Sequence, residues 1–488
     1  MDMPSDSHTR SLALGGALLV AVVGAALWFF VLGGGGGGGG VSAPESWDPE
    51  VAALVSFVEE QRGVAFVEPV AIDLVDDEGY AEAVGIGDAG ASEADQVHLQ
   101  RSLDLMRAFG LVTDRRDDEA IIAAAAPAIL DGERFATYLP AQRRIIVRAD
   151  DLAGLDAVAE AELVGALSSA LHGQYFGLST ASRLDRSTGV VGLRGVSAGA
   201  GTALTKRYVA GLTDSEQVAW ADHVKPSRGD DATAVLASFV TLSERLGEAL
   251  IDVALADTVV EGSAPGWGLV NQLFAAPPRT ELELIQPWAA LDGFERVAVA
   301  APEPDDGAEV IASGDFGAAS LYLVLGVRVD PREVLAASLV WAGDAYVLTR
   351  DPDGRRCIAV AVEGRDGDAS DLFEDAMRDW ASAGPRQADA SVEREGRVVT
   401  LQSCDPGPTA SAGIALDPAT TVSVAVNRTE LLSQLRADGS SRNSAVCTAD
   451  RVIAAIPVAA LVDPEPPPEA QILYDQLLDD SISACRNL

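Results

Sequence analysis

The sequence is poor in the side chains that bind metal ions and nucleic acids. It has four histidines and four cysteines in 488 residues, and no two cysteines stand at C-x-x-C spacing, which argues against a thiolate zinc site. Lysine and arginine total 35 against 74 acidic residues, so the formal net charge is -39. Such a chain repels phosphate backbones, which excludes nucleic acid as an expected partner. A P-loop and internal repeats are also missing.

The N-terminal region contains a long apolar segment that we assign to a membrane. Residues 11–32 carry no charge and would span about 33 Å as a helix, enough to cross the hydrocarbon core. A basic residue precedes the segment and acidic residues follow it, which favours a cytoplasmic tail over residues 1–10. We therefore expect a single-pass cell-membrane protein whose bulk is extracytoplasmic, with a glycine-rich linker at 33–50. The alternative is a cleaved signal peptide, although Pro44 directly follows its one tidy cleavage site.

Four cysteines stand at the other end of the chain. Outside the cytoplasm their natural use is in two disulfides. Three pairings are available, and the sequence does not separate them. Our guess pairs Cys404 with Cys447 and Cys357 with Cys485.

Hydrophobic periodicity predicts an α+β fold in two domains. We expect an α-rich domain over 51–290 and a smaller α+β domain with an antiparallel sheet over 291–488. In the first domain the pattern predicts two strands within 135–148, helices at 160–176 and 196–210, and a proline-rich loop at 265–287. In the second it predicts a helix at 370–383, a last short helix ending near Cys485, and strands at 320–327, 346–350, 358–362 and 398–402.

Four blocks between residues 109 and 287 follow one another in the order and spacing of a known enzyme family. The blocks are YLP at 138–140 with IIVR at 145–148, ELVGALSSALHGQYFG at 162–177, VSAGAGT at 196–202, and PGWG at 265–268 with PPRTE at 277–281. Together they resemble a family of bacterial zinc metallopeptidases of the zincin type, and VWAGDAY at 340–346 is a looser fifth match. The resemblance implies a zincin-like domain over 51–290. In that family the second block is a helix carrying H-E-x-x-H.

The residues that would carry the chemistry of this family are absent from the matching positions. Gly165 and Ser169 stand where the two zinc-binding histidines are expected, and Ala166 replaces the glutamate that activates water. Ala198 replaces the third ligand, the glutamate of an E-G-D-A-T segment. Glycine and alanine cannot coordinate zinc, and a neutral serine hydroxyl is a poor ligand. We therefore expect no metal, no cofactor and no peptidase activity.

A cleft without its metal could still bind a ligand. Its candidate lining, by the resemblance, consists of Tyr138, Ile145, Val147, His172 and Trp267, with a peptide lying along the strand at 145–148. Core packing is the alternative role for the two aromatic residues, and we expect His172 to be partly buried and hydrogen-bonded. A relocated zinc site using Glu162 and His172 is excluded because ten helical residues separate them by about 15 Å.

We therefore interpret the chain as a pseudopeptidase of the bacterial cell envelope that binds a protein or peptide at the outer face of the membrane. Two alternatives from other classes stay open. One is an active hydrolase with a non-standard site. The other is a structural envelope component without a ligand.

Overall fold

The computed structural model describes residues 43–86, 92–178, 189–224, 231–257, 266–463, 466–486 and 488. The predicted membrane helix at 11–32, the tail before it and the glycine run of the linker lie outside these residues. Within the described ranges, no helix combines the length and the apolar composition that crossing a bilayer requires.

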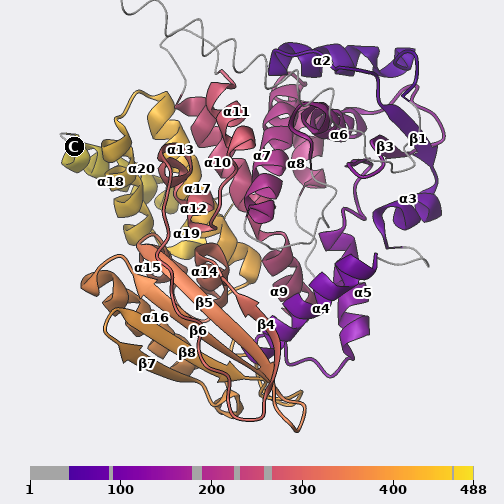
Figure 1. Ribbon diagram of the computed structural model, residues 1–488. Helices are drawn as coiled ribbons and strands as arrows, with labels where there is room; N and C mark the ends of the chain where they lie inside the picture. The colour runs from indigo at the N-terminus through magenta and orange to yellow at the C-terminus, as the bar shows by residue number, and fades with distance from the viewer. Residues whose placement is uncertain are drawn as a thin grey trace, which may run out of the picture. The chain divides into compact units, whose positions relative to one another are not determined.

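The first half of the chain is mostly helical, with a small three-stranded sheet at its edge (Figure 1). Many of its helices begin at an aspartate whose carboxylate accepts a backbone N–H of the first turn, as Asp156 does from Ala159 at 2.9 Å. Its elements are η1 (Pro49–Val51), α2 (Ala52–Arg62), β1 (Ala71–Val75), α3 (Asp77–Val84), α4 (Glu93–Ala108), α5 (Asp118–Ile129), β2 (Ala136–Leu139), β3 (Arg144–Arg148), α6 (Ala157–Phe176), α7 (Val190–Val209), α8 (Asp214–His223), α9 (Asp231–Val240), α10 (Leu242–Ala256), α11 (Gly268–Ala275), α12 (Leu282–Ile285) and α13 (Pro287–Asp292).

Helix α7 packs between α6 and α10, and α10 packs in turn on α17. Glycines set the distance between α7 and α10. A Cβ atom on Gly195 would lie 2.7 Å from the carbonyl oxygen of Ser243, and one on Gly247 would lie 2.1 Å from the carbonyl oxygen of Gly195. Side chains at these positions would force the helix backbones apart, so the small residues of α7 are needed for this packing.

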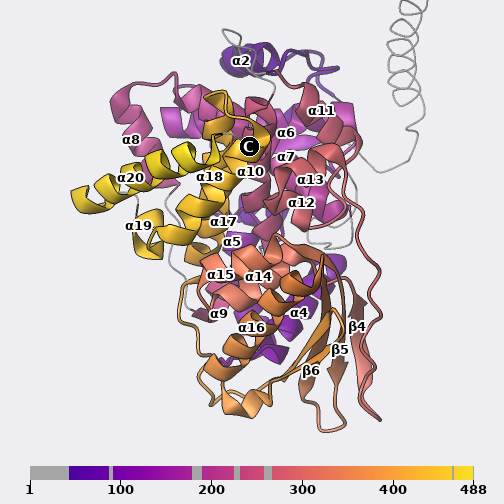
Figure 2. The same cartoon turned by 90° about the vertical axis from the view of Figure 1, so that its left-hand side faces the viewer.

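The second half of the chain is an α+β arrangement around a five-stranded sheet in the order β4-β5-β6-β8-β7, whose neighbours are all antiparallel. Figure 2 shows α14, α15 and α16 beside this sheet. This confirms the predicted α+β class with an antiparallel sheet. The elements are β4 (Glu309–Gly314), α14 (Ala318–Gly326), α15 (Pro331–Ser338), β5 (Trp341–Arg350), β6 (Arg356–Gly364), α16 (Gly367–Ala383), η2 (Arg386–Ala388), β7 (Ser391–Glu395), β8 (Val398–Cys404), α17 (Pro418–Ala437), α18 (Arg442–Ala455), α19 (Val458–Val462) and α20 (Pro468–Cys485).

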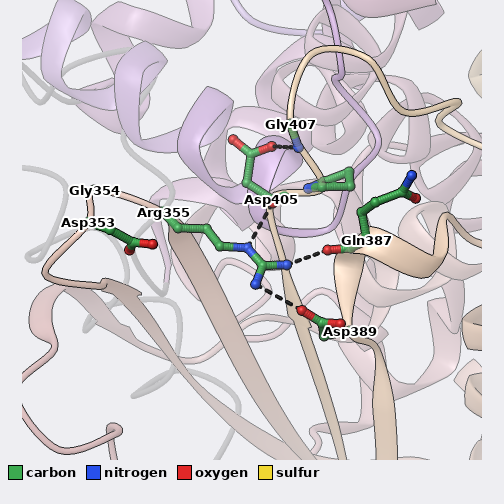
Figure 3. Close-up of a pocket in the computed structure, with 8 residues that line it drawn as sticks. Asp353, Gly354, Arg355, Gln387, Asp389, Asp405 and Gly407 are labelled. Atoms are coloured by element: carbon green, nitrogen blue, oxygen red, sulfur yellow. Dashed lines mark hydrogen bonds and ion pairs between the residues drawn. The ribbon is translucent and has the colours of Figure 1, made fainter.

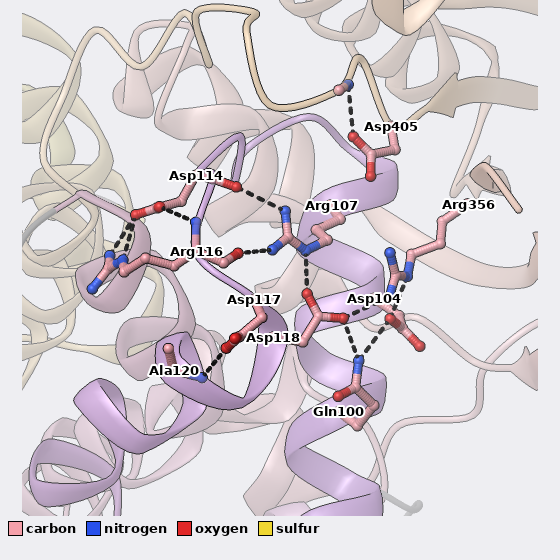
Figure 4. Close-up of polar contacts among 11 residues, drawn as sticks. Gln100, Asp104, Arg107, Asp114, Arg116, Asp117, Asp118, Ala120, Arg356 and Asp405 are labelled. Atoms are coloured by element: carbon pink, nitrogen blue, oxygen red, sulfur yellow. Dashed lines mark hydrogen bonds and ion pairs between the residues drawn. The ribbon is translucent and has the colours of Figure 1, made fainter.

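A polar network joins helices α4 and α5 to strand β6 (Figure 4). The carboxylate of Asp118 accepts hydrogen bonds from Arg107 Nε at 2.8 Å and Gln100 Nε2 at 2.9 Å, and pairs with Arg356 Nη2 at 2.6 Å. Arg356 also lies 2.5 Å from Asp104. Residues from both sides of position 290 share one hydrophobic core, and a domain boundary there stays a prediction.

Three of the predictions for individual segments are wrong. Residues 320–327 fall in helix α14 instead of a strand, because α14 is buried on all sides and a short apolar run has no periodicity that separates helix from strand. The supposed loop at 265–287 contains α11 and α12. The guessed cysteine pairing is also incorrect.

Two disulfides are present, as predicted, but they join Cys357 to Cys404 and Cys447 to Cys485. The first pair follows from strand register, since Cys357 stands directly opposite Cys404 in the antiparallel ladder of β6 and β8. The second joins α18 to the end of α20. Register between strands is set by tertiary contacts, so the cysteine spacing alone could not reveal it.

Candidate functional site

The face of α6 that carries Gly165 and Ser169 packs against α7 and is partly exposed. A Cβ atom on Gly165 would lie 3.2 Å from Thr205 Oγ1, and one on Gly201 would lie 3.5 Å from Ser169 Oγ. The hydroxyl of Ser169 donates to the carbonyl oxygen of Gly165 at 3.1 Å, within its own helix. A larger side chain at position 165 would therefore press against Thr205.

Ala166 and Ala198, the other two positions where the resemblance would place the metal site, differ in how deeply they are buried. Ala166 is buried in the core, with 5 % of its surface exposed. Ala198 is half-buried on α7. A glutamate at position 166 would bury an unpaired carboxylate, which is strongly unfavourable.

Glu162 and His172, at the two ends of this stretch of α6, are committed to separate partners. Glu162 accepts the backbone N–H of Phe135, at the start of β2, and pairs with His223 of α8 at 2.5 Å. His172 is 1 % exposed and accepts a hydrogen bond at Nε2 from Arg62 Nε at 3.0 Å. Within the described residues, no group of three or more His, Cys, Asp or Glu side chains is placed to hold a metal ion.

The surroundings of His172 keep it neutral. Burial lowers its pKa well below 6.5, and the adjacent positive charge of Arg62 lowers it further. Because Nε2 accepts from Arg62, the ring proton stands on Nδ1, which has no hydrogen-bond partner in the described part of the chain. The guanidinium of Arg62 lies 4.4 Å from the ring centroid of Trp267. Burial lowers the pKa of Arg62 to about 10.

The predicted cleft residues pack against one another and against the core. Trp267 is 8 % exposed and donates from Nε1 to the carbonyl oxygen of Gln61 at 2.8 Å. The hydroxyl of Tyr138 lies 2.8 Å from the position of a Cβ on Gly173. Ile145 and Val147 are fully buried. Strand β3, which carries them, pairs with β1 on one side and β2 on the other, so it has no free edge for a peptide strand.

A cavity of about 340 Å³ lies elsewhere, where the helical half of the chain meets the sheet. Four consecutive positions on one face of α4, at i, i+3, i+4 and i+7, form one wall: His98, Arg101, Ser102 and Leu105. The opposite walls come from the first turn of α7, the loop 278–281, the segment 313–317 and strand β5. Its size is at the lower end of the range for small-molecule sites.

Basic side chains are concentrated around this cavity although the chain is strongly acidic. Arg101, Arg279 and Arg296 all line it. Arg296 is paired with Asp315. Arg101 and Arg279 have no ion-pair or side-chain hydrogen-bond partner among the residues that the structure describes.

Two carboxylates fix the wall that contains the start of α14. Asp344 accepts the backbone N–H groups of Phe316 at 2.7 Å and Gly317 at 2.9 Å, together with Trp341 Nε1 at 3.0 Å. Glu281 accepts the N–H of Ser320 at 2.6 Å. Burial raises the pKa of Asp344 to about 6, against these three hydrogen bonds, which favour the carboxylate. Asp344 thus binds the backbone just before α14, and Glu281 binds an N–H group in its first turn.

A second hollow, shown in Figure 3, lies at the turn before β6 and has a volume of about 600 Å³. Its cation, Arg355, donates to the carbonyl oxygen of Asp405 at 2.9 Å and to the carboxylate of Asp389 at 2.9 Å, as well as to the carbonyl oxygen of Gln387. Because the Arg355 guanidinium already donates to three protein acceptors, fewer of its N–H groups are left for a ligand than at the arginines of the cavity beside α4.

Comparison with known proteins identifies no relative. A scan against protein-family models found no match, and neither did searches of curated proteins and of solved structures. The resemblance to zinc metallopeptidases therefore stays a prediction.

Sequence reasoning missed the cavity, because its walls come from segments about 250 residues apart. One signal was present in the sequence. His98 and Arg101 recur with Ser102 and Leu105 at helical spacing in a chain with few basic residues. What that face of the helix meets cannot be deduced from periodicity.

Proposed function

We propose that this chain is a membrane-anchored, extracytoplasmic binding protein without peptidase activity, and that its ligand occupies the cavity beside α4. The observation that carries the proposal is the cavity itself, which is lined on separate walls by two arginines that have no side-chain partner in the described part of the chain. The side chains at positions 165, 166 and 169 support a non-catalytic role, because glycine, alanine and a serine bonded within its own helix supply no metal ligand and no catalytic base. The two disulfides support a location outside the cytoplasm.

A cavity-filling variant tests the binding site. Ser313 lines the cavity from the exposed edge strand β4, so Ser313→Trp fills it with little change to the core. Ser391→Trp, on the opposite edge strand β7, is the matched control. The purified full chain is screened by ligand-observed NMR with a library of small fragments. We expect hits that bind the native chain and the control but not Ser313→Trp, whereas hits that ignore Ser313→Trp would contradict the proposed site.

A hydrolysis assay tests the second half of the proposal. The full chain is incubated with a denatured protein substrate, with and without added zinc. We expect no cleavage in either case. Cleavage that a chelator abolishes would refute the non-catalytic role.

A further inference from the structure

We infer that the cavity beside α4 recognises a carboxylate attached to an apolar group. This inference rests on the proposed function and specifies its ligand. Arg101 on α4 and Arg279 on the loop before α12 line one cavity from segments that are distant in sequence, and neither guanidinium has a hydrogen-bond or ion-pair partner among the described residues. Guanidinium groups bind carboxylates through two parallel hydrogen bonds, which gives both affinity and orientation.

The residues that line the cavity include three arginines and two carboxylates, Glu281 and Asp315. Asp315 is paired with Arg296, and Glu281 accepts hydrogen bonds from the N–H and hydroxyl of Ser320, at 2.6 and 2.9 Å. These neutral donors leave the charge of Glu281 in place, so the lining residues carry an excess of one positive charge. Arg101 and Arg279 are the cations left for a ligand among the described residues that line the cavity.

The start of α7 adds to the positive potential. Val191 and Gly192, in its first turn, line the cavity, and this turn contains no acidic residue. The residue before the helix is Gly189, which has no side chain to accept the first N–H groups. The helix dipole favours an anion at this end of the 20-residue helix. This contribution reinforces the arginines, which carry the inference.

Part of the remaining wall is apolar. Leu105, Phe239, Phe316, Trp341 and Tyr346 line the cavity, and all five are largely buried. An apolar body beside the charged group of the ligand would cover the apolar surface that these side chains present to the cavity.

Two sources supply this chemistry: a free organic acid, and the C-terminal residue of a peptide. Isothermal titration of the full chain in low salt separates them with four probes. These are N-acetyl-phenylalanine, its amide, and the tripeptide Gly-Gly-Phe with a free and with an amidated C-terminus. We expect the two free acids to bind and the two amides to bind at least about tenfold more weakly. The tighter of the two acids identifies the source.

Substitution of the arginines tests whether the acids bind at the cavity beside α4. Arg101→Gln and Arg279→Gln should each weaken binding of the acids by about tenfold or more. Arg451→Gln, at an exposed arginine of α18 away from the cavity, should leave the affinity unchanged. All three side chains are exposed, so thermal unfolding should show the same midpoint for each variant.

Three results would overturn the inference, and they are distinguishable. If acids and amides bound with equal affinity, the inference that the cavity recognises a carboxylate would be wrong. The cavity would still be the binding site if Ser313→Trp abolished that binding. If phenyl phosphate, titrated in the same way, bound more tightly than the acids, the group that the cavity recognises would be a phosphate and not a carboxylate. No binding of any probe, together with no fragment hits, would overturn both this inference and the proposed function.

Discussion

The carbonyl oxygen of Gly247 lies 2.3 Å from the position that a Cβ atom on Gly199 would occupy. Helices α7 and α10 therefore meet backbone to backbone. The same helix presents Gly201 to α6 on another face. The glycines at positions 199 and 201 thus allow α7 to pack closely on both neighbouring helices.

Gly199→Ala should destabilise the chain by about 2 kcal/mol. The added methyl group overlaps backbone atoms of α10, and overpacking of this kind outweighs the gain of about 1 kcal/mol in helix propensity. Urea unfolding followed by circular dichroism measures the difference. The control is Gly367→Ala at the start of α16, where a Cβ meets nothing within 4 Å and stability should be unchanged or slightly higher. If Gly199→Ala left the free energy of unfolding unchanged, the close approach of α7 and α10 would be contradicted.

Rebuilding H-E-x-x-H should fail. The triple variant Gly165→His, Ala166→Glu, Ser169→His inserts two imidazoles against Gly201 and Thr205 and buries a carboxylate at position 166. We expect less than stoichiometric zinc by elemental analysis and a lower unfolding midpoint than that of the native chain. Ser169→Ala, which removes a hydroxyl bonded within its own helix, should be tolerated. A stable triple variant with one zinc ion per chain would show that α6 and α7 can separate.

His172 should make the stability depend on pH near neutrality. Its pKa is depressed in the folded state, so below 6.5 the unfolded chain binds a proton that the folded chain does not. The free energy of unfolding should therefore fall as the pH drops below about 6.5. His172→Gln keeps an acceptor for Arg62 but does not titrate, so its stability should vary less over this range.

The control for this experiment is His98→Gln, on the cavity wall formed by α4. This variant should retain the pH dependence of the native chain. Denaturant unfolding at pH 5.5, 6.5 and 7.5 supplies the comparison. An unchanged pH slope in His172→Gln would rule out His172 as its source.

Asp118→Asn should lower the free energy of unfolding by about 3 kcal/mol at neutral pH. The substitution removes the carboxylate that pairs with two guanidinium groups, those of Arg107, which is 8 % exposed, and Arg356. Burial alone would raise the pKa of Asp118, but the hydrogen bond from Gln100 and the charges of Arg107 and Arg356 hold it below its usual value. Its stabilisation is therefore complete above pH 4 and is lost as the pH falls through the lowered pKa.

The neighbouring substitution Asp117→Asn provides the matched control. Asp117 caps α5 by accepting the N–H of Ala120 at 2.8 Å, and asparagine is an equally good cap. Its unfolding curve should match that of the native chain. If the two variants behaved alike, the network joining α4 and α5 to β6 would contribute nothing measurable.

The sequence predicted what depends on local pattern. The strand pair around Tyr138 and Ile145, helix α6 and helix α16 are present near their expected positions, since capping and periodicity act within one element. Helix α14 was missed because all its faces are buried. The cavity could not be foreseen, because Arg101 and Arg279 are brought together only by the packing of distant segments.

Each disulfide joins cysteines that are neighbours in chain order: the first with the second, and the third with the fourth. If the segment that follows a membrane anchor is translocated in sequence order, these thiols emerge one after another. An oxidase acting on the emerging chain thus finds the correct partner for Cys357 before Cys447 has appeared. Maturation in an oxidising compartment would then require thiol oxidation but no reshuffling by an isomerase.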